Sequence, residues 1–266
     1  MPTEDRVYRG LVHCHSTHSF DGSCSYAELR ALFRDKGLHF ACMTEHIEYL
    51  DQAKVDAIIC DCRLHSDGEF LFVPGIEMDC FTIYFLGVDD VTIDFTDNLS
   101  IFRSIHPKAA LCVFSHPVKA GFDYPEWLVE ICDAVEVLNT KHDGQHYLRP
   151  QSESLLGRVR TVRPGAVGLA GMDFHGYSNY SPFHLRLTRP GPLTPSFVLG
   201  QLKQGNFSVY KGDLPLASIK PLRRNYLRSR ILAMDMAHFV NRKVQGLGFK
   251  LPRSIHRLLR KTLEGG

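Results

Sequence analysis

The sequence has no hydrophobic run long enough to cross a lipid bilayer. Its longest apolar runs, at residues 109–114 and 131–138, are short or interrupted by charge, whereas a membrane-spanning helix needs about 20 apolar residues. The first ten residues include acidic side chains and no apolar stretch, so they do not resemble a secretory signal. We therefore expect a cytoplasmic protein without a transmembrane segment.

Paired CxxC motifs are also missing. The eight cysteines lie in the first half of the chain, at positions 14, 24, 42, 60, 62, 80, 112 and 132, and several fall within apolar runs. This distribution excludes the disulfide framework of a small secreted domain, and the lone CxC at residues 60–62 does not indicate a zinc ribbon. We expect Cys14, Cys42 and Cys112 to be small core residues.

The sequence does contain the ordinary balance of a folded protein, with 44% hydrophobic and 23% charged residues among 266. Its net charge of +2 hides an asymmetry, because residues 218–266 hold twelve Lys or Arg and two acidic residues and so carry +10, which leaves −8 on the remainder. An acidic body can hold cations, while a basic tail can meet anions or the body itself. Fourteen histidines make metal binding a candidate activity.

From residue 7 onward, short β-branched or aromatic runs alternate with helix-like stretches, which predicts repeated βα units around a parallel sheet. We expect strands at 7–15, 40–46, 70–80, 111–116, 134–139 and 166–175, with an extra strand at 82–88. Helices are expected at 25–37, 51–65, 124–132 and 196–204, the last after a linker at 189–195. Ser25 and Glu28 have the spacing of a capping box, and Gly37 is a natural helix end.

Side chains that can bind metals lie at or near the end of nearly every predicted strand. His13 and His15 are two residues apart, a spacing that places both on one face of a strand. The same spacing recurs at Asp173 and His175. Barrel enzymes carry their catalytic residues at these strand ends. The candidates, which we expect to converge on one rim, are His13, His15, Asp21, His46, Glu77, His116, Asp173 and His175.

The segments that carry these residues are HCHSTHSFDG, TEH, GIE, SHP and GMDFH, in that order, and together they resemble the motifs of the PHP (polymerase and histidinol phosphatase) family. The resemblance covers roughly residues 7–212, including the closing helix-and-strand segment at 194–211. It implies a distorted seven-stranded (β/α) TIM-like barrel that holds two or three divalent metal ions. We expect this barrel in residues 1–217 and a basic helical C-terminal extension in 218–266.

The resemblance also implies a role for each ligand. His13, His15 and Asp173 would bind a first ion, and Glu77 would bridge it to a second. His46 and His116 would complete the second site, and Asp21 and His175 would lie at a third site or against its ligands. Family members often place a further ligand at the end of the strand at 134–139, where this sequence has Asn139 instead, with His142 three residues on.

Mixed imidazole and carboxylate ligands suit Zn²⁺, Mn²⁺ or Fe²⁺ better than Mg²⁺ or Ca²⁺. Two such ions ~3.5–4 Å apart would generate a bridging hydroxide and neutralise the charge of a phosphoryl transition state. We therefore expect a phosphatase that hydrolyses a small phosphomonoester. Its catalytic residues would be His13, His15, Glu77, His116 and Asp173, and Lys119 and Lys141 are candidates for binding the substrate phosphate.

Two other functions are compatible with the sequence. One is a nuclease guided by the basic tail, and the other is a non-catalytic regulatory module that keeps a metal for folding. The tail has apolar residues at helical spacing, among them Tyr226, Ile231 and Leu258, with arginines on the opposite faces. Such helices pack against an acidic body or contact nucleic acid or an anionic membrane. The sequence does not indicate an oligomeric state.

Overall fold

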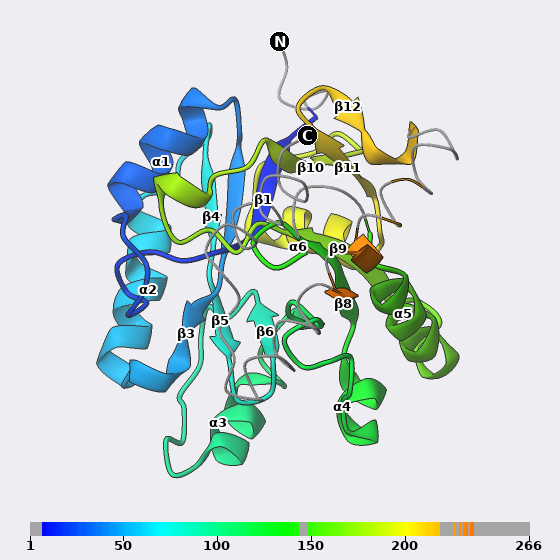
Figure 1. Cartoon of the computed structure of the whole chain (residues 1–266). Coiled ribbons are helices and arrows are strands. Elements are labelled where there is room, and N and C mark those ends of the chain that lie inside the picture. The colour runs from blue at the N-terminus through cyan, green and yellow to red at the C-terminus, as the bar shows by residue number, and fades with distance from the viewer. Residues whose placement is uncertain are drawn as a thin grey trace, which may run out of the picture.

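A computed structural model of the chain describes residues 7–143 and 148–218, together with residues 226, 229, 231–233, 235 and 236 (Figure 1). Most of the predicted extension at 218–266 therefore lies outside the described residues. Of its described part, Ile231 is fully buried in the core, and both carboxylate oxygens of Asp235 accept hydrogen bonds from Nη1 of Arg149.

Twelve strands are described, and they form two six-stranded sheets. In spatial order, the first sheet is β12-β11-β10-β1-β2-β4 and the second is β3-β5-β6-β7-β8-β9. The strands are β1 (Arg9–Cys14), β2 (Phe40–Met43), β3 (Glu45–His46), β4 (Leu71–Val73), β5 (Gly75–Met78), β6 (Ile83–Leu86), β7 (Leu111–Phe114), β8 (Ala134–Asn139), β9 (Val167–Gly171), β10 (Phe183–Leu187), β11 (Phe207–Lys211) and β12 (Leu214–Pro215). Every predicted strand contains at least one of them, whereas β10 and β12 were not predicted.

The two sheets are continuous in the chain at two points. Thr44 alone separates β2 from β3, and its backbone N–H donates to the carbonyl of Cys14. Pro74 alone separates β4 from β5, and because proline has no backbone N–H it cannot donate a hydrogen bond to a neighbouring strand. Residues that follow β9 also bond to β1, because Met172 N donates to the Val12 carbonyl and Phe174 N to that of His13.

The mixed α/β class predicted from the sequence is confirmed, but the strand ladders form two sheets and not one closed seven-stranded ring. The ladders break at Thr44 and Pro74, and β6 runs antiparallel to both β5 and β7. The loop from β5 to β6 spans only residues 79–82, which is too short for the crossover that a parallel pair needs. The closed barrel therefore stays a prediction.

Within residues 7–143 and 148–218, six α-helices connect the strands: α1 (Tyr26–Asp35), α2 (Gln52–Leu64), α3 (Asn98–Ile105), α4 (Glu126–Ile131), α5 (Pro150–Val162) and α6 (Pro195–Lys203). Short 3₁₀ turns lie at Ile47–Tyr49, Tyr177–Asn179 and Leu216–Ser218. The capping box of Ser25 and Glu28 is present, and Gly37 follows α1 with a φ of 70°. In Figure 1, α1 and α2 lie on one side of the strands and α5 on the other.

Both sheets contribute to a shared interior core. Val12 and Cys42 from the first sheet belong to the same buried cluster as Tyr84, Leu138 and Leu169 from the second. Alternate residues of the same strands face outward against the helices, as Ile83 and Phe85 do on β6. The prediction that Cys14, Cys42 and Cys112 are core residues is confirmed, since none is more than 2% exposed. Within the described part of the chain, no helix has the length and apolarity needed to traverse a bilayer.

Candidate metal centre

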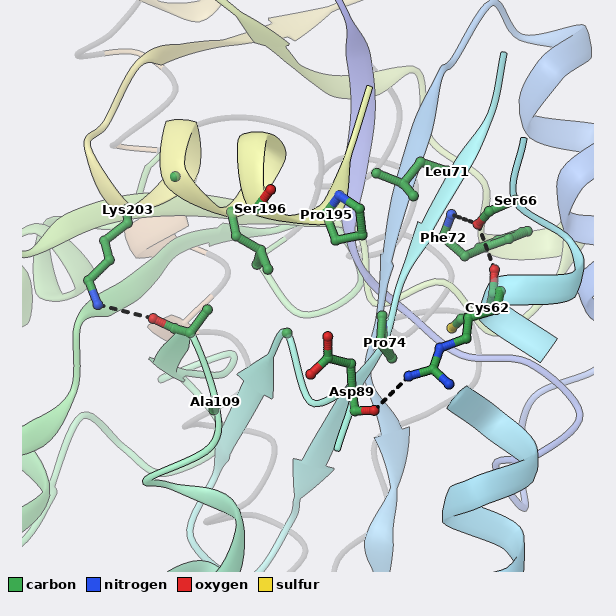
Figure 2. Close-up of a pocket in the computed structure, with 15 residues that line it drawn as sticks. Cys62, Ser66, Leu71, Phe72, Pro74, Asp89, Ala109, Pro195, Ser196 and Lys203 are labelled. Atoms are coloured by element: carbon green, nitrogen blue, oxygen red, sulfur yellow. Dashed lines mark hydrogen bonds between the residues drawn. The ribbon is translucent and has the colours of Figure 1, made fainter. Parts of the chain in front are cut away.

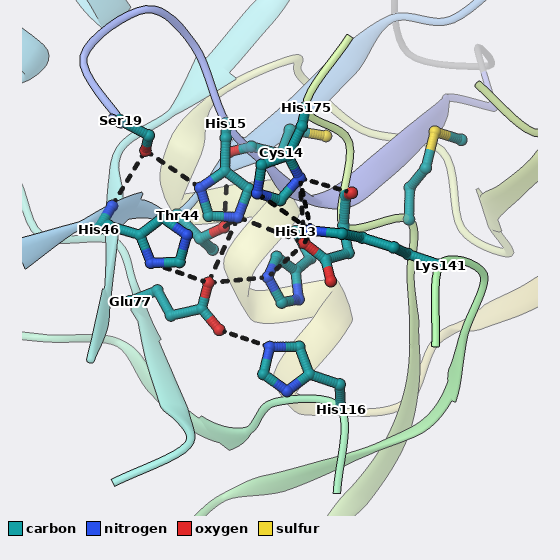
Figure 3. Close-up of polar contacts among 12 residues, drawn as sticks. His13, Cys14, His15, Ser19, Thr44, His46, Glu77, His116, Lys141 and His175 are labelled. Carbon is teal, nitrogen blue, oxygen red and sulfur yellow. Dashed lines mark hydrogen bonds and ion pairs between the residues drawn. The ribbon is translucent and has the colours of Figure 1, made fainter. Parts of the chain in front are cut away.

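All eight side chains that the sequence singled out lie in one cluster, where several strands end. Figure 3 shows six of them, His13, His15, His46, Glu77, His116 and His175. Together with His142 and Asp79, the eight side chains form overlapping groups, within each of which the potential ligand atoms lie within 4.8 Å of one another. The groups are His15, Asp21, His46 and His175; His13, Glu77 and His116; His13, His15 and Asp173; His116, His142 and Asp173; and His46, Glu77 and Asp79. The predicted convergence is therefore present, while the assignment of these residues to particular ions stays a prediction.

His13 reaches the cluster through a β-bulge. The pairing of β1 with β2 shifts register between Val12 and Cys14, and His13 is the extra residue, with a φ of 68°. Val12 and Cys14 consequently face opposite cores, although two residues apart. The expectation that His13 and His15 share a face holds, since their ring centroids lie 5.2 Å apart and Cys14 between them belongs to a different core cluster from Val12. What alternation did not predict is the bulge at His13 itself.

The backbone is strained at three residues of the cluster. Among the described residues, five that are not glycine have a positive φ, and His13, His116 and Asp173 are three of them, at 68°, 25° and 54°. A positive φ costs a residue other than glycine about 1–2 kcal/mol of conformational free energy. Strain of this kind collects at functional sites, where surrounding contacts hold the backbone in place.

Glu77 lies at the middle of the cluster and is fully buried. Its Oε2 lies 3.1 Å from His13 Nε2 and 3.3 Å from His15 Nε2, and its Oε1 lies 2.9 Å from His116 Nε2. Burial alone would raise the pKa of this carboxyl, but the charge of His13 and hydrogen bonding from the surrounding imidazoles hold the pKa well below its usual range. Glu77 is therefore a carboxylate poised to share a cation with its neighbours.

Two buried acids orient the first two imidazoles. His13 Nδ1 lies 2.9 Å from Glu136 Oε1, so the ring donates to the carboxylate and directs Nε2 at Glu77. His15 Nδ1 lies 3.1 Å from the hydroxyl of Ser19, which gives its single proton to Glu45 at 2.6 Å. His15 must therefore donate from Nδ1 and keep a lone pair on Nε2.

The two imidazoles differ in their affinity for a proton. Burial lowers the pKa of His13, but the charges of Glu77, Glu136 and Asp173 outweigh burial and raise the pKa well above its usual value. For His15, burial prevails and lowers the pKa to about 3. Without a metal, His13 is thus a positively charged imidazolium among the carboxylates at neutral pH. His15 is neutral and already presents a free lone pair on one ring nitrogen.

The donor atoms fit a bound cation. Five buried side-chain atoms of the cluster make no hydrogen bond of good geometry: His46 Nδ1, Glu77 Oε1, His116 Nδ1, His142 Nε2 and Asp173 Oδ2. Among them, Glu77 Oε1 has only the ion-pair contact with His116 Nε2, and His142 Nε2 and Asp173 Oδ2 have only each other. Each buried polar atom without a partner costs about 1–3 kcal/mol, so an arrangement with several of them requires an additional partner. Imidazole nitrogens mixed with carboxylate oxygens suit Zn²⁺, Mn²⁺ or Fe²⁺.

Both candidate lysines lie at the edge of this cluster. Lys141 Nζ is 3.4 Å from Asp173 Oδ1 and 3.2 Å from both ring nitrogens of His175. Lys119 Nζ is 3.5 Å from Asp79 Oδ1. Phe20 and Tyr49 add an exposed aromatic pair, with ring centroids 4.8 Å apart and that of Phe20 5.1 Å from His46. The rim thus combines cationic and apolar surface.

Three polar side chains of this region were not identified from the sequence, namely Glu45, Asp79 and Glu136, and His142 was noted there only as following Asn139, without a role. Glu136 had a detectable signal, since it is the one charged residue within the apolar strand at 134–139. Glu45 stands between Thr44 and His46 and had the same signal. His18, by contrast, lies away from the metal groups and pairs with Asp61 at 2.8 Å.

A second concave feature lies elsewhere. A pocket of about 690 Å³ is lined mainly by apolar side chains, among them Leu71, Pro74 and Leu199 (Figure 2). Its two cations are tied to backbone carbonyls, Arg63 to that of Asp89 and Lys203 to that of Ala110. None of the residues described around this pocket belongs to the metal groups.

Comparison with known proteins supports this reading of the fold. No protein-family model and no curated protein sequence matches the chain. A solved structure does match: a two-domain protein from Bacteroides vulgatus that contains a predicted PHP-like metal-dependent phosphoesterase, with a TM-score of 0.60 and 16% sequence identity. The match covers 80% of this chain and 67% of that one. The resemblance first noted in the motifs is thereby confirmed for the fold.

Proposed function

We propose that this protein is a metal-dependent phosphoesterase, and specifically a phosphatase that hydrolyses a small phosphomonoester. The observation that carries the proposal is the cluster of eight histidine, aspartate and glutamate side chains, with buried donor atoms that make no hydrogen bond of good geometry. The likeness to a predicted PHP-like metal-dependent phosphoesterase supports it. We also propose that the bonds from residues 172–174 to β1 complete the distorted barrel of that family.

The residues that would hold two ions are His13, His15 and Asp173 for one, and His46, Glu77 and His116 for the other. Glu77 lies between the two sets, and Asp21 and His175 would serve a third ion. When bound, such ions lower the pKa of a water molecule towards neutrality and neutralise charge on a phosphoryl group. Zn²⁺, Mn²⁺ or Fe²⁺ would fit this donor set.

The chain's own contribution is to orient the ligands and the substrate. Glu136 and Ser19 fix the tautomers of His13 and His15, so that both Nε2 atoms face the centre of the cluster. Lys141 and Lys119 bring positive charge to the rim, where a substrate phosphate would enter. The exposed rings of Phe20 and Tyr49 would contact an apolar part of the leaving group.

The test is phosphate release from a panel of phosphomonoesters with aliphatic and aromatic leaving groups, and from short oligonucleotides, in added Mn²⁺. Wild type and His15→Ala are compared side by side. Turnover of monoesters by the wild type only is the expected result. Cleavage of oligonucleotides alone would make the protein a nuclease, and binding of metal without any turnover would make it a regulatory module.

The basic tail is tested in the same assay. We propose that it contacts anions such as nucleic acid or a membrane surface. A variant that ends at residue 236 keeps Ile231 and Asp235, which contact the body of the protein. Loss of salt-dependent oligonucleotide or anionic-vesicle binding in this variant, with unchanged monoester turnover, would assign that contact to residues 237–266.

A further inference from the structure

The residue at the end of β8 cannot bind a metal as it is placed. Asn139 is fully buried, and its side-chain amide is occupied. Its Nδ2 donates to Glu136 Oε2 at 2.8 Å, and its Oδ1 accepts from the backbone N–H groups of Lys141 and His142, both at 3.0 Å. An amide oxygen has two lone pairs, and both are taken.

The same bonds turn the chain back towards the cluster. An asparagine that accepts from the N–H groups two and three residues on forms an Asx-type turn. Asp143 fixes the other side of His142, because its backbone N–H donates to the Asn139 carbonyl and its Oδ2 accepts from the Asn139 N–H, each at 2.8 Å. Arg149 in turn donates from Nε to the Asp143 carboxylate. His142 is thus held between two anchored residues.

The ring of His142 consequently points into the metal cluster. Its Nε2 lies 3.0 Å from Asp173 Oδ2, within ion-pair distance, and neither of these buried atoms has any other hydrogen-bond partner. Its ring centroid lies 4.8 Å from that of His116. The other oxygen of Asp173 faces His13, His15 and Lys141, so Oδ2 is free to act with His142.

We propose that His142 is a metal ligand that acts with His116 and Asp173, and that Asn139 positions it. The metal ligand that the resemblance led us to expect at the end of β8, where Asn139 stands, is thus supplied by His142, three residues further on in the loop. This inference rests on the metal-dependent function proposed above. The ion would be a divalent cation that accepts mixed nitrogen and oxygen donors, namely Zn²⁺, Mn²⁺ or Fe²⁺.

The experiment measures metal binding without substrate. The full-length protein is stripped of metal and titrated with Zn²⁺ and with Mn²⁺ against a chromophoric chelator, and bound metal is counted by mass spectrometry after dialysis. His142→Ala is compared with wild type and with His184→Ala, which removes a histidine on β10 outside every metal group. His142→Gln, closer in size, replaces His142→Ala if the latter melts at a lower temperature without metal.

We expect the His142 variants to lose one ion, or to bind it about tenfold to hundredfold more weakly, while His184→Ala matches wild type. The cobalt-loaded variants should also show altered ligand-field absorption bands. Asn139→Ala, which removes the turn, should weaken the same ion less than removal of His142 and should leave the bands in place. Unchanged stoichiometry and affinity in both His142 variants would overturn the inference.

This outcome is separable from that of the proposed function. A wild type that binds metal through His142 but releases no phosphate from any substrate would refute the phosphatase and keep the ligand. If the wild type releases phosphate but the His142 variants bind metal as well as the wild type does, the phosphatase is supported and the ligand role of His142 is refuted. A wild type that binds no divalent metal would overturn both.

Discussion

His13 donates from Nδ1 to Glu136 Oε1 across 2.9 Å, and neither side chain is exposed to solvent. Oε2 of the same carboxylate accepts from the backbone N–H of His116 at 2.6 Å and from Asn139 Nδ2. One buried acid therefore connects two expected ligands with the turn that carries His142. Because a carboxylate only accepts hydrogen bonds, it dictates which nitrogen of His13 holds the proton.

Replacing Glu136 by Gln should therefore reverse the tautomer of His13. The amide must turn its oxygen to the two N–H donors, which leaves its NH₂ group facing His13 Nδ1. The imidazole proton then moves to Nε2, the atom that faces Glu77, and metal affinity should fall by about tenfold to hundredfold. Nitrogen NMR of the metal-free protein, at a pH above the raised pKa of His13, would report which ring nitrogen holds the single proton. Competition with a chelator would report the metal affinity. Wild-type affinity with the proton on Nε2 would refute this account.

Because Gly171 has no side chain, it leaves room for the paired side chains of Glu136 and His13. A Cβ added at this position would lie 1.5 Å from Glu136 Oε1 and 3.1 Å from the Cβ of His13. Gly171→Ala should therefore displace Glu136, lower the free energy of unfolding by about 1–3 kcal/mol and weaken metal binding. The control is Gly157→Ala in α5, where nothing lies within 4 Å, and which should be neutral or stabilising. Equal melting temperatures for the two variants would contradict this.

Metal binding should release a proton and weaken as the pH falls. The pKa of His13 is raised by its three carboxylate neighbours, despite the burial that opposes its charge, so the metal-free ring is protonated at neutral pH. His15, with a pKa lowered to about 3, holds no proton that a metal must displace. Affinity should therefore drop about tenfold per pH unit below the raised pKa of His13. Titration calorimetry in buffers of different ionisation enthalpy counts the protons, and a count of zero at pH 7 would refute it.

Removing a central ligand should abolish turnover while the fold persists. His15→Ala and Glu77→Ala each leave seven of the eight predicted ligands in place, and we expect kcat/KM for phosphate release to fall at least about hundredfold, or about 3 kcal/mol. Removal of metal by a chelator should have the same effect on wild type. Circular dichroism checks the fold. Activity at the wild-type level in both variants would disprove the assignment of the site.

The two rim lysines should differ in their effect on substrate binding. Lys141 Nζ lies against Asp173 and His175, two of the predicted metal ligands, whereas Lys119 Nζ is paired with Asp79, which is not one of them. A hydrogen bond to a charged phosphate contributes about 1.5–3 kcal/mol, so Lys141→Ala should raise KM about tenfold or more. Lys119→Ala should have a smaller effect. Steady-state kinetics decide, and a larger loss for Lys119→Ala would reverse the assignment.

The sequence predicted which side chains meet but not how they meet. Each of the seven predicted strand regions contains a strand, because apolar runs bounded by turns are a local signal. The bulge at His13 was not predictable from alternation, since it depends on the pairing of β1 with β2. Helices α3 and α5 were also missed, and the first of them has only eight residues. His142 gave no strand-end signal, because a turn outside the strand brings it into the cluster.

The single-residue breaks at Thr44 and Pro74 have a mechanical consequence. Beyond each break the chain enters the second sheet, which carries His46 on β3 and Glu77 on β5, while His13 lies on β1 in the first sheet. A cation bound between His13 and Glu77 would therefore link the two sheets close to Thr44 and Pro74, where the strand ladders are interrupted. The proposed metal site would then also have a structural role, because its ions would cross-link the two sheets where no strand ladder joins them.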